Sequence, residues 1–136
     1  MIDTNVLLAG LKSRRGRAFQ LLELVGSDAF GIHLSVPLVL EYEEILTREQ
    51  TRLGVSSAAI ESLIDYHCSV GAHHQIFFLW RPYLPDVEDD MVLELAVKAG
   101  CDFSVTFNKK DYVGVDRFGI EAVTPAEFLR RIGVLS

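Results

Sequence analysis

The sequence has few cysteines, fewer basic than acidic residues and no long apolar run, and each shortage excludes a class of protein. Its two cysteines, Cys68 and Cys101, lack the spacing of a zinc site, which predicts reduced, packed thiols in a cytoplasmic protein. No apolar run approaches the roughly 20 residues of a membrane span and no export signal is recognisable, so we expect no membrane association. The formal net charge of −6 argues against a general nucleic-acid binder.

What is present is an alternation of strand-like and helix-like segments along 136 residues. This length predicts one domain, residues 1–136, able to bury roughly 68% of its unfolded surface. Strands are predicted over residues 1–8, 30–34, 75–79, 101–106 and 119–123. Helices are predicted over residues 18–25, 56–67 and from about 88 to 99, and after the N-caps Ser35 and Thr124. The alternation predicts an α/β fold: a three-layer α/β/α sandwich with a mostly parallel four- to five-stranded sheet.

The first segment carries the first candidate catalytic residue. Residues 1–8 have β-branched and aliphatic side chains on both sides of Asp3, which is typical of a buried parallel strand with a carboxylate near its carboxyl end. Open α/β sheets place their chemistry outside these strand ends. In the alternative interpretation, Asp3, Thr4 and Asn5 form an Asx-type turn that closes the strand.

Further polar oxygen atoms are predicted at the same edge of the sheet. Glu41 lies on the apolar face of its helix, where a carboxylate needs a cation or a metal as partner. Asp89 lies in the first turn of a predicted helix on the face towards the sheet, and Asn108 and Asp111 follow the strand 101–106. Carboxylates gathered around Asp3 would need cations between them, and oxygen ligands alone favour Mg²⁺ or Mn²⁺. Such a site suits phosphodiester hydrolysis.

Segments spread over the whole chain together resemble the PIN-domain ribonucleases, and most closely the toxin components of bacterial toxin–antitoxin pairs, similar to the VapC type. The order and spacing of the segments carry the resemblance. They are Asp-Thr-Asn-Val from residue 3, Ser35 with Glu41-Tyr42, Asp86 with Asp89-Asp90, Val-Thr-Phe-Asn-Lys-Lys-Asp-Tyr from residue 105, and Thr-Pro-Ala-Glu-Phe-Leu from residue 124.

The resemblance implies a metal-dependent endoribonuclease that cuts single-stranded or looped RNA. Asp3, Glu41 and Asp89 occupy the family's acidic positions and would hold the Mg²⁺ or Mn²⁺ ion, with Asn5 and Thr106 as neighbouring polar positions. The family's fourth acid falls at Asn108, and Asp111 is the candidate to supply the missing carboxylate. A toxin would also be expected to bind a cognate antitoxin protein and to form a homodimer. The sequence starts closer to its first motif than is common in the family, which indicates either a shortened central strand or a true start upstream of Met1.

Two clusters of basic residues are candidates for binding RNA phosphates. Both follow predicted strands whose carboxyl ends face the proposed site, so an acidic protein could still bind RNA locally. In the alternative interpretation these side chains belong to solvated loops. The candidates are Arg14, Arg15, Arg17, Lys109 and Lys110.

Two other functions are compatible with the sequence. A PIN-like module that has lost efficient catalysis would bind RNA or a protein partner, and the uncharged Asn108 favours this alternative. Three buried carboxylates speak against it, because they are destabilising without a metal. A phosphatase acting on small esters by an aspartyl-phosphate would need an acid two residues after Asp3, where Asn5 stands.

Overall fold

The computed structural model describes residues 1–75 and 95–135, and in this part of the chain helices predominate over short parallel strands. The side chain of Asp111 is also outside the description. Residues 95–99 are helical as well. The remaining elements are α1 (Thr4–Lys12), α2 (Arg17–Glu23), β1 (His33–Leu34), α3 (Val36–Arg48), α4 (Gln50–Leu53), α5 (Ser57–Val70), β2 (Ala72–His73), β3 (Phe103–Val105), the 3₁₀ helices η1 (Lys109–Tyr112) and η2 (Val115–Phe118), β4 (Glu121–Val123) and α7 (Pro125–Arg131).

The strands form two separate parallel pairs. β1 pairs with β2, and β3 pairs with β4 in a register that places Val105 opposite Val123. Ile2 adds an isolated parallel bridge to Val105. Parallel pairing agrees with an α/β fold, but a continuous sheet of four to five strands is not confirmed over residues 1–75 and 95–135. The predicted strand 75–79 lies, from residue 76 onward, outside the described residues.

The prediction of a strand over residues 1–8 is wrong. Strand pairing is limited to Ile2, because Asp3 acts as the N-cap of α1 and its side chain accepts a hydrogen bond of 2.8 Å from the amide of Thr4. The buried residues of α1 include Val6, Leu7 and Gly10, whose spacing of one and four residues is that of a helix face. The capping bond is closer to the alternative Asx-type turn, although it opens a helix instead of closing a strand.

Several helix ends are confirmed at the predicted residues. Ser35 caps α3 by accepting from the amide of Leu38, and Thr124 forms a complete capping box with Glu127 at the start of α7. Gly100 follows the helical residues 95–99 with a φ of 67°. Its amide donates to Val97 and the amide of Cys101 donates to Ala96, the two bonds of a Schellman cap.

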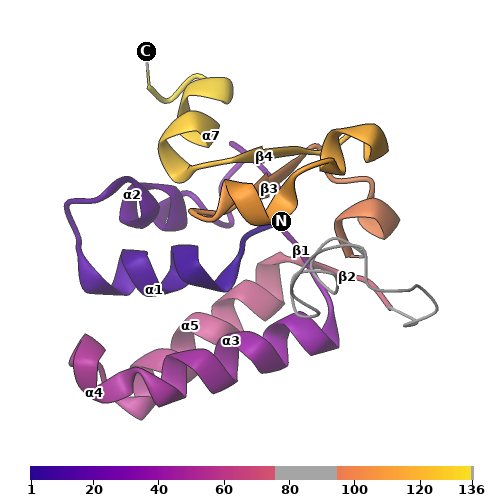
Figure 1. The fold of residues 1–136 in the computed structure, drawn as a ribbon. Coiled ribbons are helices and arrows are strands. Elements are labelled where there is room, and N and C mark those ends of the chain that lie inside the picture. Colours follow the sequence, from indigo (N-terminus) through magenta and orange to yellow (C-terminus); the bar gives the residue numbers. More distant parts are fainter. Residues whose placement is uncertain (76–94, 136) are drawn as a thin grey trace.

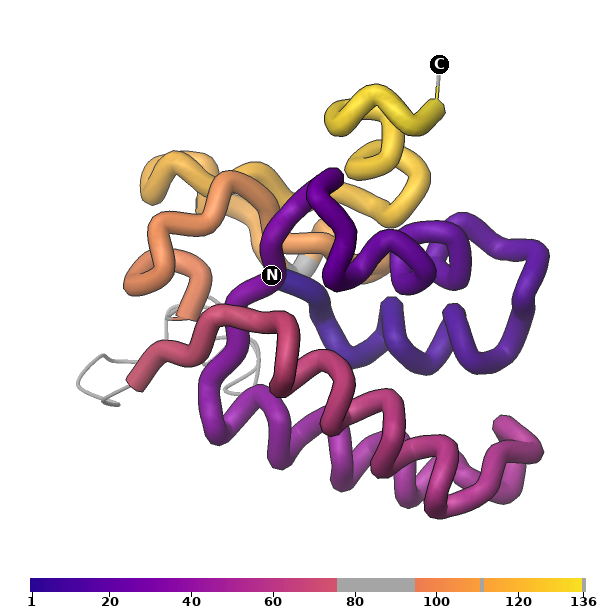
Figure 2. The backbone as a smooth tube through the Cα atoms, turned by 180° about the vertical axis from the view of Figure 1, so that it is seen from behind, coloured from indigo at the N-terminus to yellow at the C-terminus, as the bar shows by residue number. Residues whose placement is uncertain are grey.

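The helices are arranged in layers around the N-terminal segment. In Figure 1, α3 and α5 lie side by side at the bottom, α1 and α2 lie above them, and β3, β4 and α7 form the top. Figure 2 shows the same order from behind. The core between these layers is apolar, with Leu7, Leu38 and Leu129 at most 1% exposed. None of the helices in the described part of the chain has the length and apolar character needed to cross a membrane.

Candidate functional site

The carboxylate of Asp3 lies at the centre of a hydrogen-bond network between the start of α1 and the end of β3. It is only 8% exposed, and its amide donates to the carbonyl of Val105. Its Oδ2 atom accepts from Thr106 Oγ1 at 2.8 Å, from Tyr112 OH at 3.2 Å and from Asn5 Nδ2 at 3.3 Å. These donors offset part of the cost of burying a charge, and the positive end of the α1 dipole adds to them.

Thr106 and Asn5 hold this network together from two distant parts of the chain. Thr106 Oγ1 donates to Asp3 and accepts from Asn5 Nδ2 at 3.2 Å and from the amide of Asn108 at 3.0 Å, which uses the full capacity of a hydroxyl. The carbonyl oxygen of the Asn5 side chain accepts from the amide of Phe107 at 3.2 Å. The turn after β3 is therefore fixed against the first turn of α1.

Glu41 reaches the same place from α3. Its Oε2 atom accepts a hydrogen bond of 2.7 Å from the hydroxyl of Thr4, the residue next to Asp3. Burial, and then the nearby charges of Asp3 and Glu41, raise the pKa of Tyr42 well above its ordinary value. The Tyr42 hydroxyl therefore stays protonated, and it donates to the carbonyl of Ile2. Two carboxylates from α1 and α3 thus lie close to one buried phenol.

Three residues of this site were missed from the sequence. Thr4 bridges towards Glu41, Tyr112 donates to Asp3, and Tyr42 supports the chain just before Asp3. Tyr112 is the last residue of the segment Val-Thr-Phe-Asn-Lys-Lys-Asp-Tyr that begins at residue 105. Its place in this polar segment is the feature of the sequence that points to the site.

Of the three other candidate ligands, Asn108, Asp111 and Asp89, the structure describes the side chain of Asn108 alone. Asn108 is exposed, and its backbone amide, through the bond to Thr106, is the part of it that joins the network. Asp111 lies in η1, but its side chain is outside the description. Asp89 lies outside the described residues. The structure therefore brings together Asp3, Asn5, Glu41 and Thr106 of the predicted set.

The donor chemistry at this site fits a hard divalent cation. Asp3 and Glu41 offer only oxygen atoms, the ligands that Mg²⁺ and Mn²⁺ prefer. Among residues 1–75 and 95–135, however, no group of three or more His, Cys, Asp or Glu residues is close enough to hold a metal ion. A complete set of ligands would therefore need a carboxylate from outside the described side chains, and Asp89 and Asp111 are the candidates.

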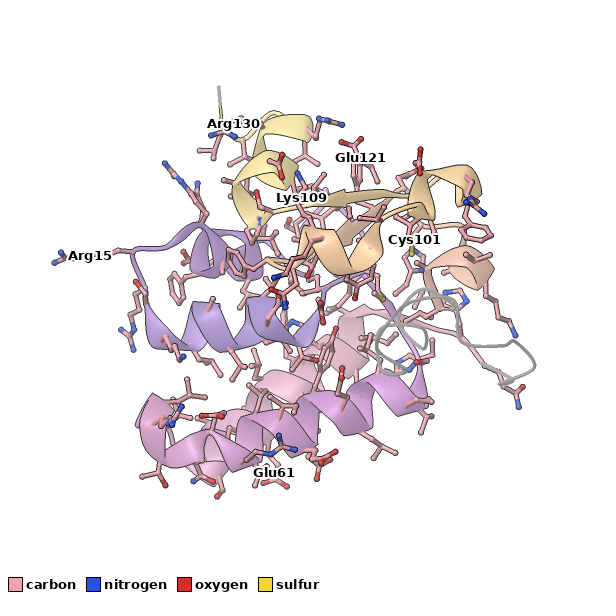
Figure 3. All side chains as sticks on the ribbon, in the orientation of Figure 1. Arg15, Glu61, Cys101, Lys109, Glu121 and Arg130 are labelled. Carbon is pink, nitrogen blue, oxygen red and sulfur yellow. The ribbon has the colours of Figure 1, made fainter. Side chains whose placement is uncertain are left out.

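The two basic clusters lie in different surroundings. Arg14 and Arg15 follow the C-cap of α1, a helix of nine residues that is roughly 14 Å long, so they lie at its far end from Asp3. Figure 3 shows Arg15 pointing away from the molecule there. The expectation that this cluster follows a strand end is wrong for that reason. Arg17 bonds to Gln20.

Lys109 and Lys110 lie in η1, directly after the turn of residues 106–108 whose hydrogen bonds reach Asp3 and Asn5. Lys109 Nζ contacts both carboxylate oxygens of Glu127 at 2.9 and 3.1 Å, while Lys110 is exposed. The hydrogen bond from the Thr124 amide, followed by the bond from Lys109, lowers the pKa of Glu127 to about 2. Lys110 is therefore better placed than Lys109 to give its charge to a ligand.

A cavity of about 320 Å³ adjoins this network through Ile2 and Val105, which belong to its lining. Its lining includes Phe30, Phe103 and Phe128, whose rings meet edge to face, with centroids 5.0 and 5.5 Å from that of Phe128. Asp3 and Glu41 do not line it. The lining is mixed, since His33 and Asp102 lie among the apolar residues, whereas the Asp3 and Glu41 carboxylates that suit phosphate chemistry gather at the start of α1.

Comparison with known protein families gives one clear similarity. The sequence matches the family described as PIN domain over residues 1–110, which include Asp3, Asn5, Glu41, Thr106 and Asn108. Neither the comparison with curated proteins nor that with solved structures gives a match. PIN domains are generally nucleases and typically depend on a divalent metal. Because the match spans 110 of 136 residues, the chain belongs to the PIN-domain family.

Proposed function

We propose that this protein is a metal-dependent endoribonuclease that hydrolyses RNA phosphodiester bonds with water as the nucleophile. The observation that supports it best is the pair of carboxylates, Asp3 and Glu41, that meet through Thr4 at the start of α1. Membership of a family of nucleases adds independent support. Within this proposal the fold is a three-layer α/β/α sandwich of the PIN type.

Asp3, Glu41 and Asp89 would hold the metal ion. A bound Mg²⁺ or Mn²⁺ would activate the attacking water and neutralise charge on the phosphate. Asn5 and Thr106 act as positioning residues, because their hydrogen bonds fix the orientation of the Asp3 carboxylate. The side-chain amide of Asn108, or the carboxylate of Asp111, would orient the water or a second ion.

The positive end of α1 is already occupied by the Asp3 carboxylate, so a phosphate at this place would be held by the metal ion and by nearby cations. Lys110 lies in η1 after the same turn and would contact a phosphate next to the scissile bond. Arg14, Arg15 and Arg17 would contact phosphates only of a longer RNA that runs along α1. Each such contact adds to the salt dependence of binding.

The resemblance to the VapC type supports a role as the toxin of a toxin–antitoxin pair in the cytoplasm. The protein would then bind an antitoxin protein and form a homodimer. The exposed apolar side chains of Val36 and Leu40, 68% and 58% exposed on α3, fit either contact because they lie near Glu41 in the sequence and share one helix face.

A second candidate is a PIN-like module that binds RNA or a protein without efficient cleavage. The uncharged Asn108 at the fourth acidic position favours it. In this case RNA would still bind near α1, but hydrolysis would be slow with any metal.

The test is cleavage of a looped RNA by purified protein with Mg²⁺ or Mn²⁺ against EDTA. Asp3→Asn is the variant of choice, because asparagine caps a helix about as well as aspartate and removes the charge. Its NH2 group cannot accept the three hydrogen bonds that Asp3 Oδ2 receives, so the fold of the variant is checked by circular dichroism first. Glu61→Gln, an exposed acid on α5, is the matched control. We expect cleavage by wild type and Glu61→Gln only with metal, and none by folded Asp3→Asn. If wild type binds RNA but does not cut it, the second candidate replaces the first.

A further inference from the structure

Phe107 presents an aromatic ring to solvent directly beside the candidate site. Its side chain is 47% exposed, whereas Thr106, the residue before it, is completely buried. Phe30 and Phe103 instead pack their rings against Phe128. A half-exposed phenylalanine forgoes part of the stabilisation that burial would give it. A single exposed apolar residue is common, so its surroundings decide whether it has a role.

The backbone around Phe107 is tied to the candidate site on both sides. Its own amide donates to Asn5 Oδ1 at 3.2 Å, and the next amide, that of Asn108, donates to Thr106 Oγ1 at 3.0 Å. Asn5 and Thr106 both donate to Asp3 Oδ2. The ring is therefore carried by a turn whose position is fixed relative to the carboxylate of Asp3.

Basic residues follow the ring at once. Lys109 and Lys110 begin η1 two and three residues after Phe107, and Lys110 is exposed. Proteins that bind single-stranded nucleic acid combine cations that follow the phosphates with aromatic rings on which bases stack. The segment from Phe107 to Lys110 offers both groups within four residues.

We propose that Phe107 stacks on an unpaired base next to the scissile phosphate and so selects single-stranded or looped RNA. The inference rests on the proposed ribonuclease function and names the part of the substrate that the site recognises. In a duplex both faces of each base are covered by neighbouring bases, so the ring finds no free face. Unpaired bases of any identity satisfy it, which predicts selection by strandedness rather than by sequence.

The test measures binding of a short fluorescent single-stranded RNA by anisotropy, in EDTA and with Ca²⁺, for the full chain. Phe107→Ala is expected to weaken binding between about 5-fold and about 150-fold, and Phe107→Trp is expected to restore it. Phe107→Leu keeps an apolar side chain without a ring and should weaken binding like alanine. Val113→Ala, at a position that is 77% exposed in the same surface segment, is the control and should bind like wild type.

An abasic strand of the same length isolates the stacking, because it keeps the phosphates and lacks the bases. Wild type and Phe107→Ala should bind it equally. If Phe107→Ala binds ordinary RNA as tightly as wild type while wild type cuts it, the inference is overturned and the ribonuclease proposal stands. If Phe107→Leu behaves as wild type, the ring is not stacking and an apolar contact, such as one to a protein partner, is the better account.

The proposed function can fail separately. If wild type never cuts RNA but loses binding in Phe107→Ala, the ribonuclease proposal falls and base stacking is supported in a binding module. If wild type neither cuts nor binds RNA, both are overturned. Circular dichroism of each variant checks that the fold is intact, and Phe107→Trp guards against a loss that only reflects misfolding.

Discussion

The hydroxyl of Thr106 is the sharpest place to test whether the polar network stabilises the fold. Thr106→Val removes the hydroxyl and changes the shape of the side chain little. The hydroxyl donates to Asp3 and accepts from Asn5 and from the amide of Asn108, and the side chain is completely buried. With valine at this position, Asp3, Asn5 and the amide of Asn108 each lose one hydrogen-bond partner.

The loss of stability follows from these three bonds. A hydrogen bond to a charged group contributes about 1.5–3 kcal/mol, and a neutral one about 0.5–1.5 kcal/mol. Water can replace part of the bonds to Asn5 and Asn108 because Asn5 is half-buried and Asn108 is exposed. The methyl group that replaces the hydroxyl recovers about 0.8 kcal/mol. We expect Thr106→Val to lower the free energy of unfolding by about 2–4 kcal/mol.

Ser104 provides the matched control two residues earlier on β3. It is 2% exposed, and its Oγ atom has no hydrogen-bond partner within the described part of the chain. Ser104→Ala should therefore leave stability unchanged or raise it. In urea unfolding with a slope of about 2 kcal/mol per M, Thr106→Val should lower the midpoint by about 1–2 M. Equal midpoints for the two variants would refute the stabilising role of the network.

Three other substitutions test separate features. Burial lowers the pKa of His67 below 6.5, so stability should fall as the pH drops below about 6.5, where the unfolded chain takes up the proton; His67→Phe should flatten this dependence in thermal melts. Glu127→Ala should lower the free energy of unfolding by about 1 kcal/mol at pH 7, measured by urea unfolding. This difference should disappear between pH 4.5 and about 2, because the carboxylate is protonated first in the unfolded and then in the folded chain. Arg15→Ala should leave cleavage of a short RNA unchanged but lower the salt slope for binding a long RNA by about 1.

The features that were predicted from the sequence are those set by local chemistry. Ser35 and Thr124 cap helices because their hydroxyls accept from an amide three residues on, and Gly100 ends a helix because it adopts a positive φ. Such signals need only a few neighbouring residues. The family resemblance, which depends on the order of several segments, agrees with the PIN-domain match.

The element that carries Asp3 could not be predicted in the same way. A short apolar run such as residues 1–8 fits a buried strand and a buried helix equally well. The contacts that decide between them join Asp3 to Val105, Thr106 and Tyr112, which lie about a hundred residues away. For the same reason the role of Tyr112 was missed. Asp3 and Glu41 still lie close together although the strand prediction is wrong. Asp3 directly follows Ile2, which pairs with Val105, and so keeps the position expected of a residue at a strand end.

The carboxylate of Asp3 at the start of α1 lies close enough to that of Glu41 for the two charges to repel each other, and a cation between them would relieve this repulsion. The cap and the helix dipole favour one carboxylate there, but Glu41 brings a second negative charge to the neighbouring Thr4. A ligand at 100 times its dissociation constant stabilises the folded chain by about 2.7 kcal/mol. Mn²⁺ or Mg²⁺ should therefore raise the melting temperature of wild type and of Glu61→Gln above the value in EDTA, and Asp3→Asn should lose most of that rise. An equal rise in all three proteins would show that the cation binds elsewhere, and the carboxylate pair would then be only a structural contact.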